Sequence, residues 1–450
     1  MASTYLTRTF SSSGTSDKIW TWSSWIKRSE VTGEAAILTA GSSARDFIRF
    51  EASTTIGALR VRFSNGSADV TTNRRFRDTS GWYHLVVAVD TTQATASNRI
   101  KIYINGVQET SFSSSSYPSQ NYVTKIGGGY VHNIGNDSEQ TVPYFDGSMS
   151  HINFIDGTAY DASAFGEYDA NGVWTIKTSP SVTYGTNGFF ILKDGNSVTD
   201  QSGNSNNFTV GGGTLTKTED CSANVFATWN GVMDFASSGT FSNGNTQWNS
   251  GAATNRFWCT SSIGVSTGKW YVEMKNTVQG SHNLIGIAPR SAPALDWYLG
   301  GSGLVANADD DYQWGYKAED GNIVNNTNST SYGNTYGTTD IIGIALDLDN
   351  NKLYFSKNGT WQNSGDPTSG ATGTGAVSIT SASSNPTGVY HIVGANATSG
   401  NSSTFQANFG NGYFGTTAVA SAGTNASGIG IFEYDVPTGF TALSTKGLNL

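Results

Sequence analysis

Charged residues, cysteine and proline are all scarce in this sequence of 450 residues, and each shortage excludes a class of protein. Two cysteines are too few for a disulfide framework. Eight prolines, with no three-residue glycine period, exclude a collagen. No run approaches the ~18 apolar residues of a membrane-spanning helix, so membrane insertion is not expected. With 25 basic against 34 acidic residues the net charge is -9, and general attraction to nucleic acid is not expected either.

Glycine, hydroxyl-bearing residues and aromatic residues are abundant instead. The chain has 54 glycines and 12% aromatic residues, and serine and threonine together make up about a quarter of it. Disordered chains lack aromatic residues, and helical bundles need more of the strong helix formers Glu, Lys and Arg than a 13% charged content supplies. The composition therefore predicts an all-β, turn-rich protein with little helix. At roughly 100 to 200 residues per domain, the length predicts two domains.

Apolar residues alternate with polar ones along several short segments, as expected for strands with one buried face. Alternation at residues 59–63, 100–104 and 342–348 predicts three such strands. Asn-Gly pairs at 105–106 and 358–359 mark hairpin turns. We therefore expect two β-sandwiches of one general type.

Turn residues concentrate between about 195 and 224, which is the best domain boundary in the chain. The sequence therefore predicts a first sandwich over 1–210, a linker over 211–224, a second sandwich over 225–430 and a C-terminal tail segment over 431–450. Cys221 and Cys259 are expected to be two thiols, with a single bridge as the alternative.

Particular stretches of both segments resemble known families. Residues 1–195 resemble a laminin G-like, concanavalin A-type jelly roll, and the stretches that carry this resemblance are 22–27, 81–86, 102–106, 145–148 and 152–157. The second segment resembles a SPRY (B30.2-like) domain, another concanavalin A-like sandwich, through 268–273, 285–288, 342–349, 353–355 and 358–359. Both resemblances imply tandem concanavalin A-like β-sandwiches.

The joint and the end of the chain carry a third resemblance. Residues 200–209 with 224–228, and the closing segment 434–443, are similar to segments of large virion proteins of marine tailed bacteriophages. This resemblance implies a structural protein of a virion, in a fibre, a tail or the capsid surface, where it is expected to be a homo-oligomer that contacts other virion proteins. The N-terminal residues show no apolar core of a signal peptide, which fits release by lysis or a viral origin. Adhesion to host surface polysaccharide is the expected activity, and a purely structural cement is one alternative.

A polysaccharide depolymerase is the other alternative, because concanavalin A-like folds include glucanases. A retaining glycosidase needs two carboxyl groups about 5 to 5.5 Å apart, and the glucanase pattern Glu-x-Asp-x-x-Glu does not occur in this sequence. Glu30 and Glu34 flank a turn-like Val-Thr-Gly, and Asp347 and Asp349 are expected to hydrogen-bond the amides of a hairpin turn. The sequence therefore predicts that the protein is not an enzyme.

Two groups of residues are candidate binding sites. Carboxylates can supply oxygen ligands to Ca²⁺, and neighbouring aromatic rings can stack on a sugar. The first group, for glycan or calcium, is Asp309, Asp310, Asp311, Tyr312 and Trp314. The second, for calcium, is Asp146, Asp156 and Asp161, which lie where laminin G-like domains often coordinate this ion. Ca²⁺ is the one cofactor that the sequence suggests.

Overall fold

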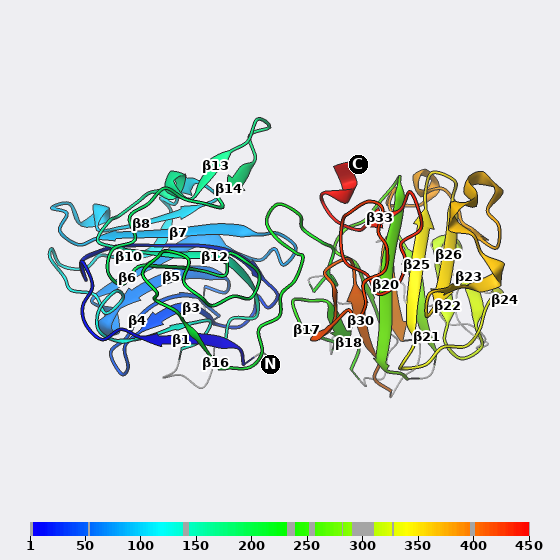
Figure 1. Cartoon of the computed structure of the whole chain (residues 1–450), viewed down its shortest axis with the longest axis horizontal. Coiled ribbons are helices and arrows are strands. Elements are labelled where there is room, and N and C mark those ends of the chain that lie inside the picture. The colour runs from blue at the N-terminus through cyan, green and yellow to red at the C-terminus, as the bar shows by residue number, and fades with distance from the viewer. Residues whose placement is uncertain are drawn as a thin grey trace. The chain divides into compact units, whose positions relative to one another are not determined.

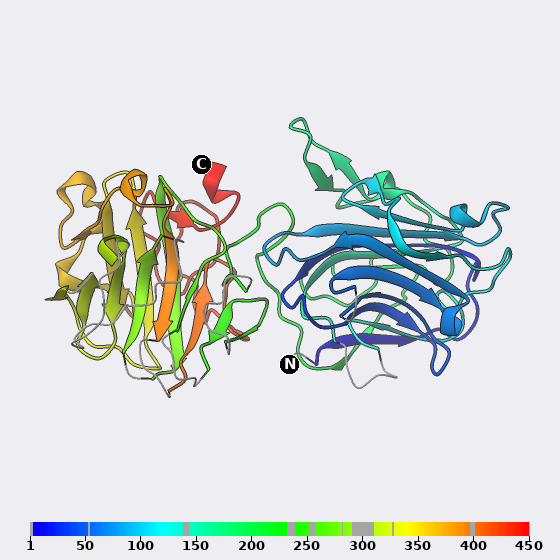
Figure 2. The same cartoon turned by 180° about the vertical axis from the view of Figure 1, so that it is seen from behind.

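The chain divides into two units, which are described separately. The computed structural model describes residues 3–52, 55–137, 144–231, 239–251, 257–280, 282–289, 310–325, 328–396 and 401–449. The first unit comprises Met1–Lys217 with Cys221–Ala223, and the second comprises Thr218–Asp220 with Asn224–Leu450 (Figures 1 and 2). Cys221 and Cys259 form no disulfide.

Within its described residues, the first unit is built from two large sheets. The eight-stranded sheet has the order β10-β6-β5-β4-β3-β11-β1-β16. Its strands are β1 (Tyr5–Thr9), β3 (Ala35–Ala40), β4 (Asp46–Phe50), β5 (Ala58–Phe63), β6 (Ala68–Arg75), β10 (Phe112–Ser116), β11 (Val131–Ile134) and β16 (Thr209–Gly212). The six-stranded sheet has the order β15-β12-β2-β7-β8-β9. Its strands are β2 (Ile19–Arg28), β7 (Tyr83–Asp90), β8 (Ile100–Ile104), β9 (Val107–Gln108), β12 (Gly147–Asp156) and β15 (Phe189–Ile191).

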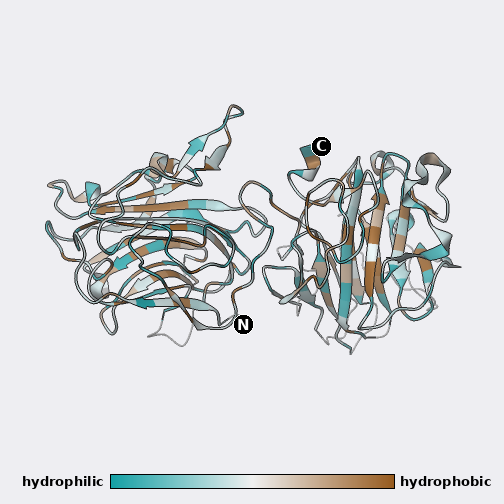
Figure 3. Ribbon diagram, in the orientation of Figure 1, coloured by the Kyte–Doolittle hydropathy of each residue, from teal (hydrophilic) through white to brown (hydrophobic). Residues whose placement is uncertain are grey.

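The core of the first unit consists of apolar residues from both large sheets, as the alternation predicts. Leu59, Val61 and Phe63 of β5 are fully buried, whereas Arg60 and Arg62 between them are only partly buried. Figure 3 shows this change between apolar and polar residues along the strands. The prediction of an all-β sandwich is confirmed for this unit.

The outer face of the six-stranded sheet is covered by residues 157–186. This segment contains the hairpin of β13 (Gly166–Tyr168) and β14 (Trp174–Ile176), drawn at the top of the first unit in Figure 1. Trp174 stacks on His84 of β7, and His84 stacks on Trp25 of β2. This cover explains why residues 85–89 are continuously apolar, because both of their faces are buried. The short 3₁₀ helices of the unit are η1 (Ser64–Gly66), η2 (Ala96–Asn98) and η3 (Ala162–Ala164).

The second unit also has two large sheets in its described part. The larger follows the path β17-β18-β30-β20-β25-β26-β27, with β28 beside β26 and β33 beside β20; the other has the order β19-β29-β21-β22-β23-β24. The strands of the larger sheet are β17 (Thr240–Ser242), β18 (Gln247–Asn249), β20 (Lys269–Val278), β25 (Ile341–Asp347), β26 (Lys352–Lys357), β27 (Thr360–Trp361), β28 (Val377–Ser378), β30 (Thr404–Asn408) and β33 (Thr441–Ala442). Those of the other are β19 (Phe257–Thr260), β21 (Asn283–Ala288), β22 (Trp314–Lys317), β23 (Asn322–Asn325), β24 (Asn328–Ser331) and β29 (His391–Asn396).

Short elements connect and extend these sheets. They are the strand pair β31 (Tyr413–Phe414) and β32 (Thr417–Ala418), and the 3₁₀ helices η4 (Asp310–Tyr312), η5 (Gln362–Ser364), η6 (Pro367–Thr372), η7 (Ala382–Ser384) and η8 (Gly447–Asn449). In the described parts of the chain, no helix has both the length and the apolar character that crossing a membrane requires.

The unit boundaries differ from the predicted ones at two places. Strand β16 straddles the predicted end at residue 210, because it pairs with β1 at the edge of the eight-stranded sheet. The predicted tail over 431–450 packs into the second unit: β33 pairs in parallel with β20, and Phe432, Phe440 and Leu443 are buried in the core. The C-terminal segment therefore completes the second sandwich.

Candidate ligand-binding pocket

Asp156, one of the three aspartates predicted to bind calcium, is 2% exposed, and both of its carboxylate oxygens are used by the backbone. Oδ2 accepts the N–H of Thr15 at 2.6 Å and that of Asn187 at 2.8 Å, and Oδ1 accepts the N–H of Ser16 at 2.8 Å. Backbone donors therefore occupy the positions that a metal ion would need. Asp156 fastens two loops to the end of β12.

Asp146 and Asp161 do not join Asp156. Asp146 precedes β12 and Asp156 ends it, and ten strand residues at ~3.3 Å each separate the two by about 30 Å. Asp161 caps η3, where its Oδ1 accepts the N–H and the hydroxyl of Ser163. Across the described ranges, no three His, Cys, Asp or Glu side chains are placed to hold a metal ion. The calcium site predicted at these three residues is therefore not formed among the described residues, because Asp146 and Asp156 lie at opposite ends of β12 and Asp161 caps η3.

The predicted cluster at 309–314 is divided between surface and core. Asp309 lies outside the described residues, and of Asp310 only the backbone, in η4, is described. Asp311 is exposed and Tyr312 is partly buried against the core. Trp314 is 6% exposed and packs edge-on against Tyr390, so its ring is not available to a sugar. The prediction that Trp314 stacks on a ligand is wrong for this reason.

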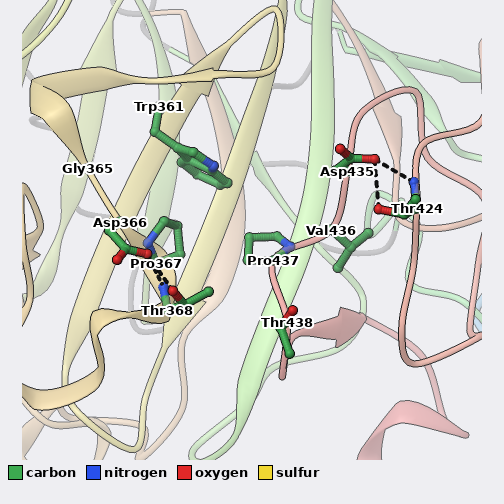
Figure 4. A pocket seen from close by; sticks show the side chains of 10 residues that line it. All are labelled: Trp361, Gly365, Asp366, Pro367, Thr368, Thr424, Asp435, Val436, Pro437 and Thr438. Atoms are coloured by element: carbon green, nitrogen blue, oxygen red, sulfur yellow. Dashed lines mark hydrogen bonds between the residues drawn. The ribbon is translucent and has the colours of Figure 1, made fainter.

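A pocket of about 380 Å³ opens on the second unit where β27, η5 and η6 meet the C-terminal segment (Figure 4). One wall carries Trp361, Asp366 and Pro367, and the other carries Asp435 and Pro437. The remaining lining residues are Gly365, Thr368, Thr424, Val436 and Thr438.

Trp361 is placed in the pocket by the β26–β27 hairpin. Asn358 and Gly359 turn the chain with φ of 49° and 78°, the left-handed region that Asn and Gly tolerate best. A Cβ on Gly359 would lie 2.6 Å from the ring of Tyr434, so the turn also brings the C-terminal segment close. The indole is half-buried, and its Nε1–H bonds no acceptor among the described residues. Trp361 therefore offers an apolar ring surface together with one donor.

Asp366 and Asp435 are held in the same way on opposite walls. Oδ1 of Asp366 accepts the N–H and hydroxyl of Thr368 at 2.8 and 2.6 Å, and Oδ1 of Asp435 accepts those of Thr424 at 2.6 and 2.8 Å. These bonds lower the pKa of both carboxyl groups, the Thr368 hydroxyl contributing most at Asp366 and the Thr424 amide most at Asp435. Both side chains are exposed. The pocket therefore presents two ionised, oriented carboxylates.

The wall formed by the C-terminal segment is anchored by a buried carboxylate. Glu273 of β20 is fully buried, and it accepts the backbone N–H groups of Glu433 and Tyr434 at 2.8 Å each. The hydroxyl of Tyr271 and the amide of Asn408 donate to it at 3.1 and 3.3 Å. Since residues 433 and 434 immediately precede Asp435, Glu273 sets the position of this wall.

None of the pocket residues is among the candidates that the sequence predicts. The closing segment carries only a resemblance to phage proteins, and nothing in the sequence around Trp361 marks it as a binding residue. The available signals were the short Asp-Pro-Thr sequence at 366–368 and the Asp-Val-Pro-Thr sequence at 435–438, in which an aspartate, a turn-forming proline and a threonine recur together. These local patterns do not predict that the two segments, 366–368 and 435–438, come together in one pocket.

Comparisons with known proteins agree with the two sandwiches. The family model of the concanavalin A-like lectin/glucanases superfamily, in its laminin G form, matches residues 2–162, and that of the SPRY domain matches residues 268–405. No curated protein sequence matches the chain.

Two solved structures are similar to parts of this chain, at low sequence identity and low TM-score. The crystal structure of the SPRY domain of human HERC1 is 15% identical, with a TM-score of 0.28, and the match covers 40% of this chain and 96% of that one. A candidate carbohydrate-binding protein of Bacteroides ovatus is also 15% identical, with a TM-score of 0.33, and the match covers 48% of this chain and 58% of that one. On the two family matches, the chain carries a laminin G-like domain of the concanavalin A-like superfamily followed by a SPRY domain.

Proposed function

We propose that the protein is a non-enzymatic glycan-binding protein and that the pocket of the second unit is a sugar-binding site. The observation that carries this proposal is the pairing of an accessible indole with two oriented carboxylates in one pocket. A sugar ring presents C–H groups on its faces and hydroxyl donors at its edge, so it matches an aromatic surface bordered by acceptors. The match of the first unit to a superfamily of lectins and glucanases supports the same function.

Replacement of Trp361 by alanine is expected to weaken glycan binding about 10- to 100-fold, the usual effect of removing a central aromatic contact. Trp361 contacts Tyr271 and Tyr354 through edge-on ring packing. The alanine variant is therefore expected to fold with reduced stability, and Trp361→Phe, which keeps an aromatic surface, is expected to retain most of the binding. A glycan array followed by calorimetry on the bound glycans measures the effect.

Tyr168→Ala is the matched control for this experiment. Tyr168 is a 54% exposed aromatic residue of the first unit, outside the pocket. Its replacement should leave binding unchanged. Loss of binding in Tyr168→Ala but not in Trp361→Ala would place the glycan on the first unit and contradict the proposed site.

The carboxylates that could have formed a catalytic pair have structural partners, which supports a function without catalysis. Asp347 accepts the N–H and the side-chain amide of Asn350 and lies 3.1 Å from the ammonium of Lys269, so it holds a hairpin as expected. Asp349 instead accepts the N–H of Gly268, which lies outside the hairpin turn. Glu30 accepts donors of Thr32 and Gly33 in its own turn, and Glu34 pairs with Arg49. Release of reducing sugars from a bound polysaccharide would favour the depolymerase alternative.

The setting that we propose is the surface of a tailed-phage virion, where a homo-oligomer of the protein would attach to host polysaccharide beside other virion proteins. The resemblance of residues 200–209, 224–228 and 434–443 to phage virion proteins supports this location. Antibodies against the purified protein are expected to label the fibre, tail or capsid surface of particles in electron micrographs. Labelled particles combined with a glycan array that shows no binding would favour the cement alternative.

A further inference from the structure

Each pocket carboxylate has one oxygen to spare. Threonine donors occupy Oδ1 of Asp366 and Oδ1 of Asp435, and no donor among the described residues bonds either Oδ2. Both side chains are exposed, so these oxygens can accept hydrogen bonds from a ligand. The threonine bonds also restrict how the carboxylates rotate, which reduces the entropy lost when a ligand binds.

The lining of the pocket is negative and carries no compensating charge. Its ten residues include two aspartates and no lysine, arginine or histidine. A carboxylate accepts hydrogen bonds but does not donate them, so a sugar bearing carboxylate, sulfate or phosphate groups would face repulsion and a shortage of donors. Uronic and other acidic sugars therefore do not fit the site.

We propose that the pocket binds a glycan residue that carries a free, positively charged amino group, as in a deacetylated 2-amino-2-deoxyhexose. This inference rests on the proposed glycan-binding function and specifies its ligand. An ammonium group supplies hydrogen-bond donors and a positive charge to the spare oxygen of one aspartate, and the hydroxyl groups of the same sugar can donate to the other. The indole of Trp361 adds attraction for the cation and packs against the ring C–H groups.

The arrangement of the two walls favours an amino sugar over a lysine side chain. Asp366 and Asp435 stand on opposite walls, with Trp361 and Pro367 beside one and Pro437 beside the other (Figure 4). A rigid amino sugar carries donors around its perimeter, so its ammonium and hydroxyl groups can reach both walls while one face lies on the indole. A lysine has donors at one end only.

The test compares four probes on the full chain by calorimetry at pH 6. The probes are an oligomer of β-1,4-linked glucosamine, its N-acetylated counterpart, an oligogalacturonate and an oligolysine of the same charge as the glucosamine oligomer. We expect the glucosamine oligomer to bind about 10-fold more tightly than the acetylated one, with a preference that falls as salt is raised, and no binding of the oligogalacturonate.

Three variants connect this preference to the pocket. Asp366→Asn and Asp435→Asn should each weaken binding of the glucosamine oligomer about 3- to 5-fold more than binding of the acetylated oligomer, because only the first loses an ion pair. Asp320→Asn, which changes an exposed aspartate of the same unit outside the pocket, should change neither. Trp361→Ala should weaken both oligomers.

The remaining outcomes separate this inference from the proposed function. Equal or tighter binding of the acetylated oligomer, with loss in Trp361→Ala, would overturn the inference and leave the glycan site standing. Tighter binding of the oligogalacturonate would overturn it as well. Binding of oligolysine alone would replace the glycan by a basic peptide, whereas binding of no probe in the calorimeter and of no glycan on the array would contradict both proposals.

Discussion

Replacement of Glu273 by alanine is expected to lower the free energy of unfolding of the second unit by about 3 kcal/mol and to release the wall of the pocket that carries Asp435. The carboxylate of Glu273 is the acceptor for the N–H groups of Glu433 and Tyr434, and these groups would lose their bonds in the interior. The side-chain donors of Tyr271 and Asn408 would lose theirs too. Glycan affinity should fall together with stability.

Hydrogen exchange measured by mass spectrometry can distinguish the two effects. Peptides spanning 431–443 should exchange much faster in Glu273→Ala, while peptides of the first unit should not change. Glu319→Ala, which removes an exposed glutamate from the same unit, is the matched control and should leave exchange unaltered. Unchanged protection of 431–443 in Glu273→Ala would show that packing of Phe432, Phe440 and Leu443 holds the segment without the carboxylate.

The pH dependence of this contribution has a definite sign. Burial raises the pKa of Glu273 to about 7 from an ordinary value of 4.5, even though its four donors favour the ionised form. Between these two values the folded chain holds a proton that the unfolded chain has released, so this group's contribution to stability is lost as the pH rises from 4.5 to 7. The Glu273→Gln variant, which cannot titrate, should lack this slope.

Acidification is expected to destabilise the first unit, which is the opposite sign. Two of its buried histidines contribute about 6 kcal/mol of this loss between pH 7 and pH 4. Burial lowers the pKa of His84 to about 3 and that of His132 to about 4, against 6.5 for a free histidine. Below pH 6.5 the unfolded chain takes up protons that the folded chain cannot, so stability is lost as the pH falls. The loss is comparable to the whole stability of many domains.

The hydrogen bonds of both rings explain why they stay neutral. Nδ1 of His84 accepts the indole N–H of Trp174 at 3.0 Å, which leaves Nε2 as the donor to the hydroxyl of Ser23. Nε2 of His132 accepts the N–H of Gly127 at 3.0 Å, and Nδ1 donates to the carbonyl of Tyr130. A second proton would therefore break a bond in each case, as well as place a charge in the interior.

Urea titrations at several pH values measure the stability of each unit in the full chain. At each urea concentration, a brief hydrogen-exchange pulse at one fixed pH gives the unfolded fraction of each unit. The first-unit transition should move to lower urea as the pH falls from 7 to 4. In His84→Gln the free energy of unfolding should fall less steeply with decreasing pH, because one histidine no longer takes up a proton on unfolding. A slope that is unchanged in this variant would mean that His84 is protonated in the folded chain.

The sequence by itself determined the all-β class, the two sandwiches and several individual strands. Period-two alternation requires only that one face of a strand be buried, and β5 and β8 follow it residue by residue. The Asn-Gly turns are equally local, since positive φ favours these two residues wherever the fold places them. The role of Asp347 in its hairpin was predictable for the same reason, because its partner Asn350 lies three residues away.

The tertiary structure alone decided which polar and aromatic side chains face solvent. Asp156 and Trp314 are of residue types that are common in binding sites. The carboxylate of Asp156, however, accepts backbone N–H groups of distant loops, and the indole of Trp314 is buried beside Tyr390. Trp361 and Asp435 become neighbours because β33 pairs with β20 and Glu273 holds the preceding residues. Local patterns predict strands and turns because their causes lie within a few residues, whereas a pocket depends on the pairing of segments that are distant in the sequence.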